Sequence, residues 1–436
     1  MPPLNCVRRL CAATSNGWIR YRPWAFVLGW TIVCGATMAD AQPSALTPTA
    51  PTLPAAAAPA QADPVSPAQE SGTQPKFVES ARRWADEHQI LERLSGDVDG
   101  WYPRLGGMTR GSGFALGPGY RTHVLDDRVL IDASAAITIR RYKAVDVRAR
   151  WLQTWNERVE VWTDYRFEDF PQEDFYGLGP DTVESMRTSY AIRGSDFTVR
   201  AQVKPLPWLR TGLNVGYLSP KVGPGRDREF PSIEEVFPGT SLPGLLEQPD
   251  FIHTQLFAEV DYRDTPGNPR RGGFYRAAYS TWDDRTLEAY NFRRFDTNLS
   301  QFAPLTADRK HIVSGRVGLS FVNNAPGDRV PFYALPYVGG TDTVRSYREF
   351  RFKEENAMWL GVEYRWIPIK WVSGVLFADA GKVARNWQDV IDAADMKQGY
   401  GFGVAVHSSK QTFARIDFGF GGGEGRRIFL KLGPSF

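Results

Sequence analysis

The sequence predicts an all-β fold: a sixteen-stranded antiparallel transmembrane β-barrel preceded by one short N-terminal periplasmic helix. Hydrophobic residues alternate with polar or small residues over 107–436, which is the period of strands with two different faces. Many of these strands reach the roughly 9–11 residues that cross a bilayer at a tilt of about 45°. Trp and Tyr gather at the strand ends, as expected at membrane interfaces. Because a closed barrel satisfies every backbone polar group in lipid, a barrel is favoured over a soluble two-sheet sandwich.

Residues 1–41 have the three parts of a secretory signal peptide. Four arginines precede the apolar run at 24–36, and the small residues Ala39 and Ala41 form the expected cleavage site. A single transmembrane anchor is the alternative, but the apolar run is shorter than the ~20 residues that span a bilayer. The sequence therefore indicates a secreted chain.

The leader carries all three cysteines of the chain. The whole chain has 52 basic and 49 acidic residues, and four arginines and Asp40 leave with the leader, so the mature chain has 48 of each. The lack of cysteine excludes thiol chemistry, disulfides and thiolate metal sites from the mature chain. The balanced charge argues against nucleic acid as a partner, which would need a clustered basic face.

Two segments lie between the leader and the barrel. Residues 42–75 are mostly Ala, Pro, Gln, Ser and Thr, and this composition predicts a disordered linker. Residues 76–95 are rich in helix formers and place apolar residues at helical spacing. We expect one short amphipathic helix here, in the periplasm.

The barrel is expected over residues 107–436, with its first strand at 110–121. Glycines at positions 111, 113, 117 and 119 would weaken the pairing of that strand, although they could equally relieve crowding in a tilted wall. The pattern predicts separate strands at 186–193 and 196–206. These divisions give sixteen strands in total.

Loop lengths provide an independent test of the strand order. With both termini in the periplasm, connections after odd-numbered strands face outward and can be long. The longest ones, 220–250 and 325–356, follow strands seven and eleven, and we call the second one loop six. The connection at 169–185 conflicts with this scheme, because it follows strand four, where a short periplasmic turn is expected.

Loop six and the two strands after it hold the main candidate site. Glu363 and Asp379 fall on the inward parity of adjacent strands, opposite their apolar neighbours. Two carboxylates at this spacing repel each other and favour a guanidinium between them, which Arg345 of loop six could supply. A purely structural ion cluster is the alternative. The other candidate residues of the loop are Gly339, Gly340, Val344, Ser346 and Tyr347.

The chain has an ordered set of motifs: Gly339-Gly340, Arg345-Ser346-Tyr347, Gly361-Val362-Glu363, Phe377-Ala378-Asp379-Ala380-Gly381 and the C-terminal Phe436. This set resembles the BamA/TamA-type outer-membrane assembly barrels, the bacterial surface antigen superfamily. The resemblance implies that loop six folds into the lumen and that Arg345 locks onto Glu363 and Asp379. It also implies insertion or translocation of polypeptides at the outer membrane of a Gram-negative bacterium. Outer-membrane lipid, unfolded polypeptide clients and a separate periplasmic protein are the expected partners. The last strand resembles an insertion signal, or an ordinary lipid-facing strand, through Leu430, Leu432 and Phe436.

The chain departs from the family pattern in two places. Ser346 stands where the loop-six motif usually has glycine, so the geometry of the loop apex is in question. The linker and helix leave no room for POTRA domains, so we expect a member without them.

No pattern in the sequence indicates an enzyme, a cofactor or a metal centre. Nucleophile-elbow, zinc-protease and P-loop motifs are absent, and the five histidines have no ligand spacing. A lumen hydrolase built on His253 is a minor alternative. The main alternative to polypeptide insertion is a transporter or a pore-forming barrel with loop six as its lumen plug.

Overall fold

The computed structural model describes residues 99–106, 108, 112–152, 158–237 and 241–432. The predicted signal peptide with Ala39 and Ala41, the linker at 42–75, the helix at 76–95 and Phe436 lie outside the described residues. The described residues therefore comprise the strands of the sheet and the connections between them.

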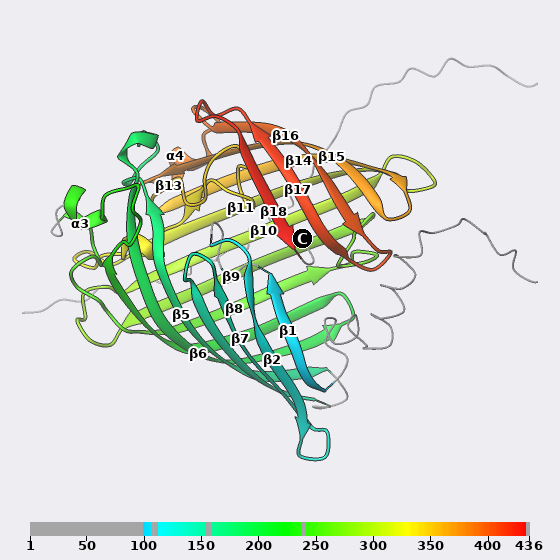
Figure 1. Ribbon diagram of the computed structural model, residues 1–436, viewed down its shortest axis with the longest axis horizontal. Helices are drawn as coiled ribbons and strands as arrows, with labels where there is room; N and C mark the ends of the chain where they lie inside the picture. Colours follow the sequence, from blue (N-terminus) through cyan, green and yellow to red (C-terminus); the bar gives the residue numbers. More distant parts are fainter. Residues whose placement is uncertain (1–98, 107, 109–111, 153–157, 238–240, 433–436) are drawn as a thin grey trace, which may run out of the picture. The chain divides into compact units, whose positions relative to one another are not determined.

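Sixteen antiparallel strands form one sheet, in which each strand pairs with its neighbours in the order of the chain. Figure 1 shows the sheet curling round on itself into a barrel, with β1 and β18 as its end strands. The strands are β1 (Gly100–Gly106), β2 (Ala115–Val124), β3 (Val129–Thr138), β4 (Lys143–Trp151), β5 (Val159–Phe175), β6 (Thr188–Leu206), β7 (Leu209–Pro224), β8 (Phe251–Asp261), β9 (Gly272–Asp284), β10 (Phe292–Pro304), β11 (His311–Asn324), β14 (Asn356–Ile369), β15 (Val372–Ala384), β16 (Lys397–His407), β17 (Thr412–Phe420) and β18 (Arg427–Leu432).

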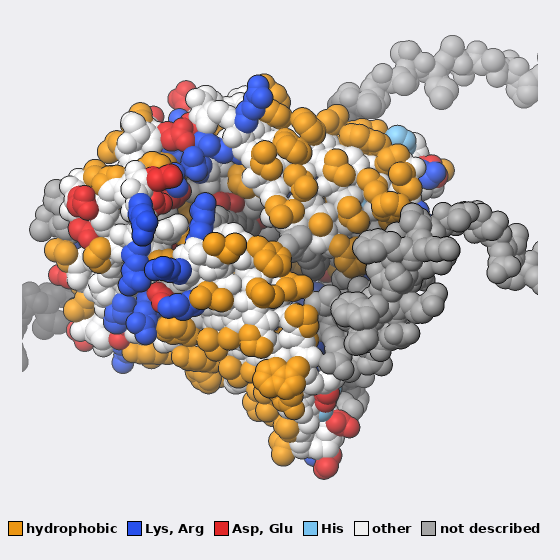
Figure 2. Space-filling model, viewed as in Figure 1, with side chains coloured by type: hydrophobic (Ala, Val, Ile, Leu, Met, Phe, Trp, Pro, Cys, Tyr) orange, Lys and Arg blue, Asp and Glu red, His pale blue; other side chains and the backbone are white. Residues whose placement is uncertain are grey.

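The alternating pattern sorts side chains between lipid and lumen. On β14, outward-facing Val362 is 52% exposed, whereas inward-facing Arg365 is 5% exposed. Figure 2 shows exposed hydrophobic side chains covering a broad band of the outer wall. This arrangement is inside out relative to a soluble protein and is typical of a barrel in lipid. Within the described residues, no helix is long and apolar enough to cross a membrane.

The predicted number of strands is correct, but two of the divisions are wrong. The sheet begins at Gly100, before the expected barrel start at residue 107. Strand β1 contains a proline and two glycines, which disfavour strands locally. Pairing with β2 and two inward hydrogen bonds hold it: the Tyr102 hydroxyl donates to Asp132 at 2.7 Å, and Arg104 donates to Ser134 at 3.0 Å.

The predicted strands at 186–193 and 196–206 are one strand, β6. The pair Gly194 and Ser195 looks like a turn in sequence, but Gly194 is paired with Glu168 of β5 and with Pro220 of β7. Pairing on both sides therefore carries the strand through the apparent break. With β1 added, the connection after Phe175 follows the fifth strand. It belongs at the end with the long connections, so the conflict in the predicted topology disappears.

The glycines expected in the first strand lie elsewhere, and Gly119 fits the alternative role, relief of crowding. Gly117 and Gly119 lie in β2, Gly113 lies in the β1–β2 connection, and position 111 is outside the described residues. A Cβ atom on Gly119 would lie 2.2 Å from the ring of Tyr102. This glycine therefore makes room for a lumen side chain of β1.

The long connections pack together at one end of the barrel. Two apolar clusters there join strand ends to loop residues; one places Ile233 and Phe332 against Phe175, and the other places Leu335 against Phe251. The same connections contain every short element of the described chain: η1 (Glu184–Met186), α3 (Ile233–Val236), η3 (Phe332–Ala334), β12 (Tyr337–Val338), β13 (Phe352–Lys353) and α4 (Trp387–Ile391).

Candidate functional site

Loop six folds back on itself and packs against the inner wall. Its two short strands β12 and β13 pair antiparallel, and Gly339 and Gly340 turn the chain after β12 with φ of 120° and 99°. These backbone angles favour glycine. The loop is anchored by a buried apolar cluster that it shares with β14 and β15: Val338, Val344, Tyr347, Phe352, Ala357 and Val383.

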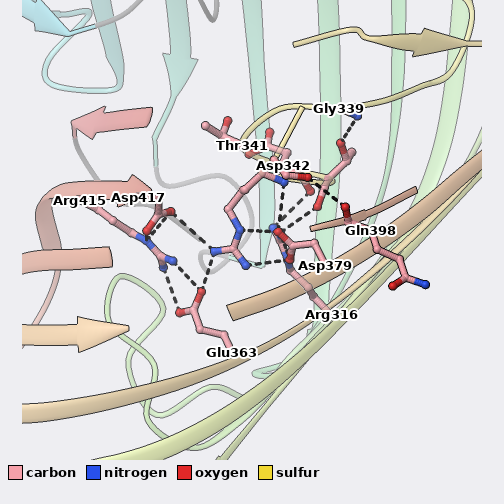
Figure 3. Close-up of polar contacts among 12 residues, drawn as sticks. Arg316, Gly339, Thr341, Asp342, Glu363, Asp379, Gln398, Arg415 and Asp417 are labelled. Carbon is pink, nitrogen blue, oxygen red and sulfur yellow. Dashed lines mark hydrogen bonds and ion pairs between the residues drawn. The ribbon is translucent and has the colours of Figure 1, made fainter. Parts of the chain in front are cut away.

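Arg345 at the apex contacts both predicted acids, Glu363 and Asp379, which are labelled in Figure 3. Its Nε donates to Oδ2 of Asp379 at 2.7 Å, and its Nη2 donates to Oδ1 of the same carboxylate at 2.8 Å. Its Nη1 donates to Glu363 at 3.0 Å. The guanidinium also lies over the ring of Phe377, 3.6 Å from the centroid. Arg345 and Asp379 are both almost fully buried, so few other anions could reach this arginine.

Three further charged residues, which the sequence analysis did not single out, complete the site. Arg316 of β11 donates to Asp379 at 3.1 Å. Arg415 of β17 donates to Glu363 at 2.7 and 3.0 Å and to Asp417 at 2.8 Å. The alternation on β17 places Arg415 and Asp417 inward, but it does not show which inward residues meet across the barrel.

The six residues form a neutral cluster of three guanidinium groups and three carboxylates. We call this the ionic cluster: Arg316, Arg345, Glu363, Asp379, Arg415 and Asp417. Buried charges at this density are tolerated only when each is paired and hydrogen-bonded. The cluster joins loop six to β11, β14, β15 and β17, so removing one partner would leave a buried charge without full compensation.

Serine fits at the apex of loop six because Gly399 and Gly419 in the barrel wall leave room for the apex. Ser346 is fully buried and donates to the carbonyl of Gln398 at 3.3 Å. A Cβ atom on Gly399 would lie 2.1 Å from the Ser346 hydroxyl, and one on Gly419 would lie 1.9 Å from the carbonyl oxygen of Arg345. These close approaches let the apex lie directly on β16 and β17.

Loop six is also tied to two neighbouring connections. Arg351 pairs with Glu424 at 2.7 Å and donates to the Thr182 carbonyl at 2.7 Å. Glu184 accepts from Arg348 at 3.2 Å and from Arg427 at 2.7 Å. Burial raises the pKa of Glu184, but the hydrogen bonds from Arg427 and Arg348 outweigh it, so the pKa lies below its usual value. These contacts hold the loop at the end with the long connections.

A cavity of about 1150 Å³ lies in the lumen beside the ionic cluster. Its lining includes Arg345, Glu363 and Asp417 of the cluster. It also includes Gly106 at the end of β1 and the inward-facing Arg427, Phe429 and Lys431 of β18. The lumen space therefore extends from the apex of loop six to both end strands of the sheet.

Two of the predicted insertion-signal residues, Leu430 and Leu432, lie in the last strand, β18. Leu430 is 61% exposed on the outer face of β18, and Leu432 is the last residue of that strand. The outward exposure of Leu430 agrees with lipid contact and also with the predicted insertion signal. No group of three or more His, Cys, Asp or Glu side chains in the described part of the chain is arranged to hold a metal ion.

Comparisons with known proteins agree with this architecture. The Omp85 superfamily domain matches residues 197–436, more than half of the chain. The fold is similar to BamA from Haemophilus ducreyi lacking POTRA domains 1–3, with a TM-score of 0.58 and 15% identity over 78% of this chain and 71% of that one. No curated protein matches the sequence.

A second solved structure with a similar fold is CdiB from Escherichia coli. Its TM-score is 0.51 and its identity is 11%, over 76% of this chain and 62% of that one. This chain thus spans less than two thirds of CdiB. The family match confirms the resemblance indicated by the motifs of loop six and the strands after it. The chain belongs to the Omp85 superfamily and is an outer-membrane β-barrel of a Gram-negative bacterium.

Proposed function

We propose that this protein assists the insertion or translocation of polypeptides at the outer membrane. The observation that carries the proposal is the position of loop six, which contacts the inner wall through the ionic cluster, beside a cavity that reaches both β1 and β18. Family membership supports the same activity. The proposed role of Arg345, Glu363 and Asp379 is conformational: they hold loop six in its docked position.

The end strands support a route for clients between lumen and lipid. Strand β1 has seven residues and β18 has six, against 17 in β5 and 19 in β6. Pro103 in β1 has no backbone N–H, so this strand offers fewer donors to a partner. Among the described residues no ladder joins β1 to β18, and two strands this short could form only a few hydrogen bonds to close the seam between them. The expected surroundings of the wall are outer-membrane lipid, and a separate periplasmic protein could deliver clients.

Quantitative proteomics of the outer membrane after depletion tests this proposal. Loss of one or more barrel proteins, or of one secreted protein, is the expected result. An unchanged outer-membrane and secreted proteome would overturn the proposal.

The large lumen cavity specifically favours a second candidate, a pore or transporter that loop six plugs. Planar-bilayer recording of the purified protein separates the two functions. A large, stable, ohmic current together with an unchanged proteome would favour the pore.

A further inference from the structure

A second cavity, of about 780 Å³, lies in the lumen at the end of the barrel that carries the short turns. Lys204 and Arg210 flank the two-residue turn between β6 and β7, and Arg150 lies near the end of β4. The lining side chains come from β2 to β8, on strands that do not contribute to the ionic cluster. Its cations, which we call the basic basin, are Arg121, Arg148, Arg150, Arg200, Lys204 and Arg210.

Acidic side chains in this cavity are too few for the cations. The lining has three carboxylates, Asp132, Glu160 and Glu259, against six cations. Glu160 is shared by Lys204 and Arg150, the latter at 3.4 Å. Glu259 is shared by Arg210 at 2.7 Å and by an arginine of β9 at 3.4 Å.

Two more acids near the lining do not balance the charge, because Asp261, 3.8 Å from Arg210, already pairs with Arg263 at 2.8 Å. Asp164 contacts Arg148 at 2.5 Å and Arg200 at 2.8 Å, so this carboxylate is shared as well. In the described part of the chain, Nη1 of Arg121 is buried without a hydrogen-bond partner. The contrast with the ionic cluster is clear, because there three guanidinium groups meet three carboxylates. The basic basin keeps donor capacity that its own acids do not use.

The basin is open to a ligand and has an aromatic surface at its centre. The side chains of Arg148, Arg150 and Arg200 are between 36% and 56% exposed although they point into the lumen. Trp162 lies between Arg150 and Arg200 in one cross-strand row. A flat indole next to guanidinium groups offers an apolar contact beside each charged one.

We infer that the basic basin binds an acidic segment of an extended polypeptide, and this inference rests on the proposed function. Guanidinium groups match carboxylates as paired donors, which favours Asp and Glu side chains as ligands. The cavity volume is within the range of about 300–1,000 Å³ that ligand sites occupy. The basin lies at the end expected to face the periplasm, where a client would first enter the lumen. It therefore serves as a first contact for acidic clients, while loop six closes the far end.

The test measures binding of a fluorescent acidic peptide, alternating Glu with Phe, to the full-length protein in detergent by anisotropy. A peptide with Gln in place of Glu and inorganic phosphate serve as comparison probes. Arg150→Gln and Arg200→Gln should each weaken binding of the acidic peptide about tenfold, since each removes charge-assisted contacts. Arg294→Gln is the matched control, because it removes a lumen arginine that pairs with Asp296 outside the basin. Heat-modifiable migration of each variant verifies that the barrel is folded.

The expected result is binding of the acidic peptide that weakens with salt, falls in both basin variants and is unchanged in Arg294→Gln. Equal binding of the Gln peptide, equal binding by the basin variants, or binding of phosphate alone would overturn the inference. The binding assay does not require insertion activity, so the proteome test can fail separately from this one.

Discussion

The substitution Arg345→Met tests whether the ionic cluster holds loop six in the lumen. The Arg345 side chain donates three hydrogen bonds, two to Asp379 and one to Glu363, whereas its backbone N–H donates a further one to Asp379 that methionine would keep. Breaking a buried ion pair from one side costs about 3–5 kcal/mol. Because Arg316 still compensates Asp379 and Arg415 still compensates Glu363, we expect the lower end, about 3 kcal/mol. At 1.4 kcal/mol per tenfold change, undocking should become roughly 100-fold more frequent.

Thiol labelling gives a direct measurement, since the mature chain is expected to have no cysteine of its own. The probe is Ser346→Cys, at a position that is fully buried when the loop is docked. When opening and closing are fast relative to labelling, the maleimide rate follows the open population. The rate should therefore rise roughly 100-fold when Arg345→Met is added.

Arg329→Met is the control within the same loop. Arg329 forms an exposed pair with Glu247, and such pairs contribute about 0–1 kcal/mol, so labelling should rise less than about fivefold. If Arg345→Met labels within about threefold of its parent, the ionic cluster does not hold the loop.

Three further predictions use the same labelling assay or barrel assembly. Gly419→Ala should raise labelling roughly 5- to 150-fold, because overpacking against the Arg345 carbonyl costs about 1–3 kcal/mol. The control is Gly315→Ala, whose Cβ would meet nothing within 4 Å and which should leave labelling unchanged. Equal labelling rates for the two variants would contradict the close packing at Gly419. Burial lowers the pKa of Lys353 in loop six to about 8, against the effect of nearby Glu173, so the protonated form destabilises the docked loop. This cost, up to about 3 kcal/mol, is full below pH 8 and disappears toward the unfolded pKa near 10.4. Labelling of Ser346→Cys, relative to an exposed cysteine, should therefore fall as the pH rises through that window. Lys353→Met should abolish the trend, and an unchanged trend would assign it to another group. Leu430→Arg on the lipid-facing side of β18 should cost up to about 2–4 kcal/mol and reduce heat-resistant barrel in membrane fractions, and normal amounts would place this residue away from the hydrocarbon.

The sequence alone predicted the face that each strand presents to lipid or lumen. Side chains alternate strictly along a strand, so one apolar parity is enough to place Glu363 and Asp379 inward. The motif resemblance paired these acids with Arg345, and the structure has all three in contact. These features were predictable because each depends on local periodicity or on a motif in one stretch of chain.

Strand boundaries depended on partners far along the chain. Gly194 lies within a strand because β5 and β7 pair with it on both sides, and β1 forms despite its proline because β2 and β3 supply its contacts. Local propensity contains no information about those partners. This is the physical reason why a correct strand count concealed one missed strand and one false break.

Only the tertiary structure decided which inward side chains meet. Arg415 is 70 residues from Arg345 in the sequence, and the curvature of the sheet brings both to Glu363. The same curvature gathers six cations of β2 to β7 around too few acids in the basic basin, although the chain without its expected leader would be neutral by composition. Composition counts charges over the whole chain, whereas electrostatic interactions depend on distance, and distances across a barrel are fixed only when the sheet curls.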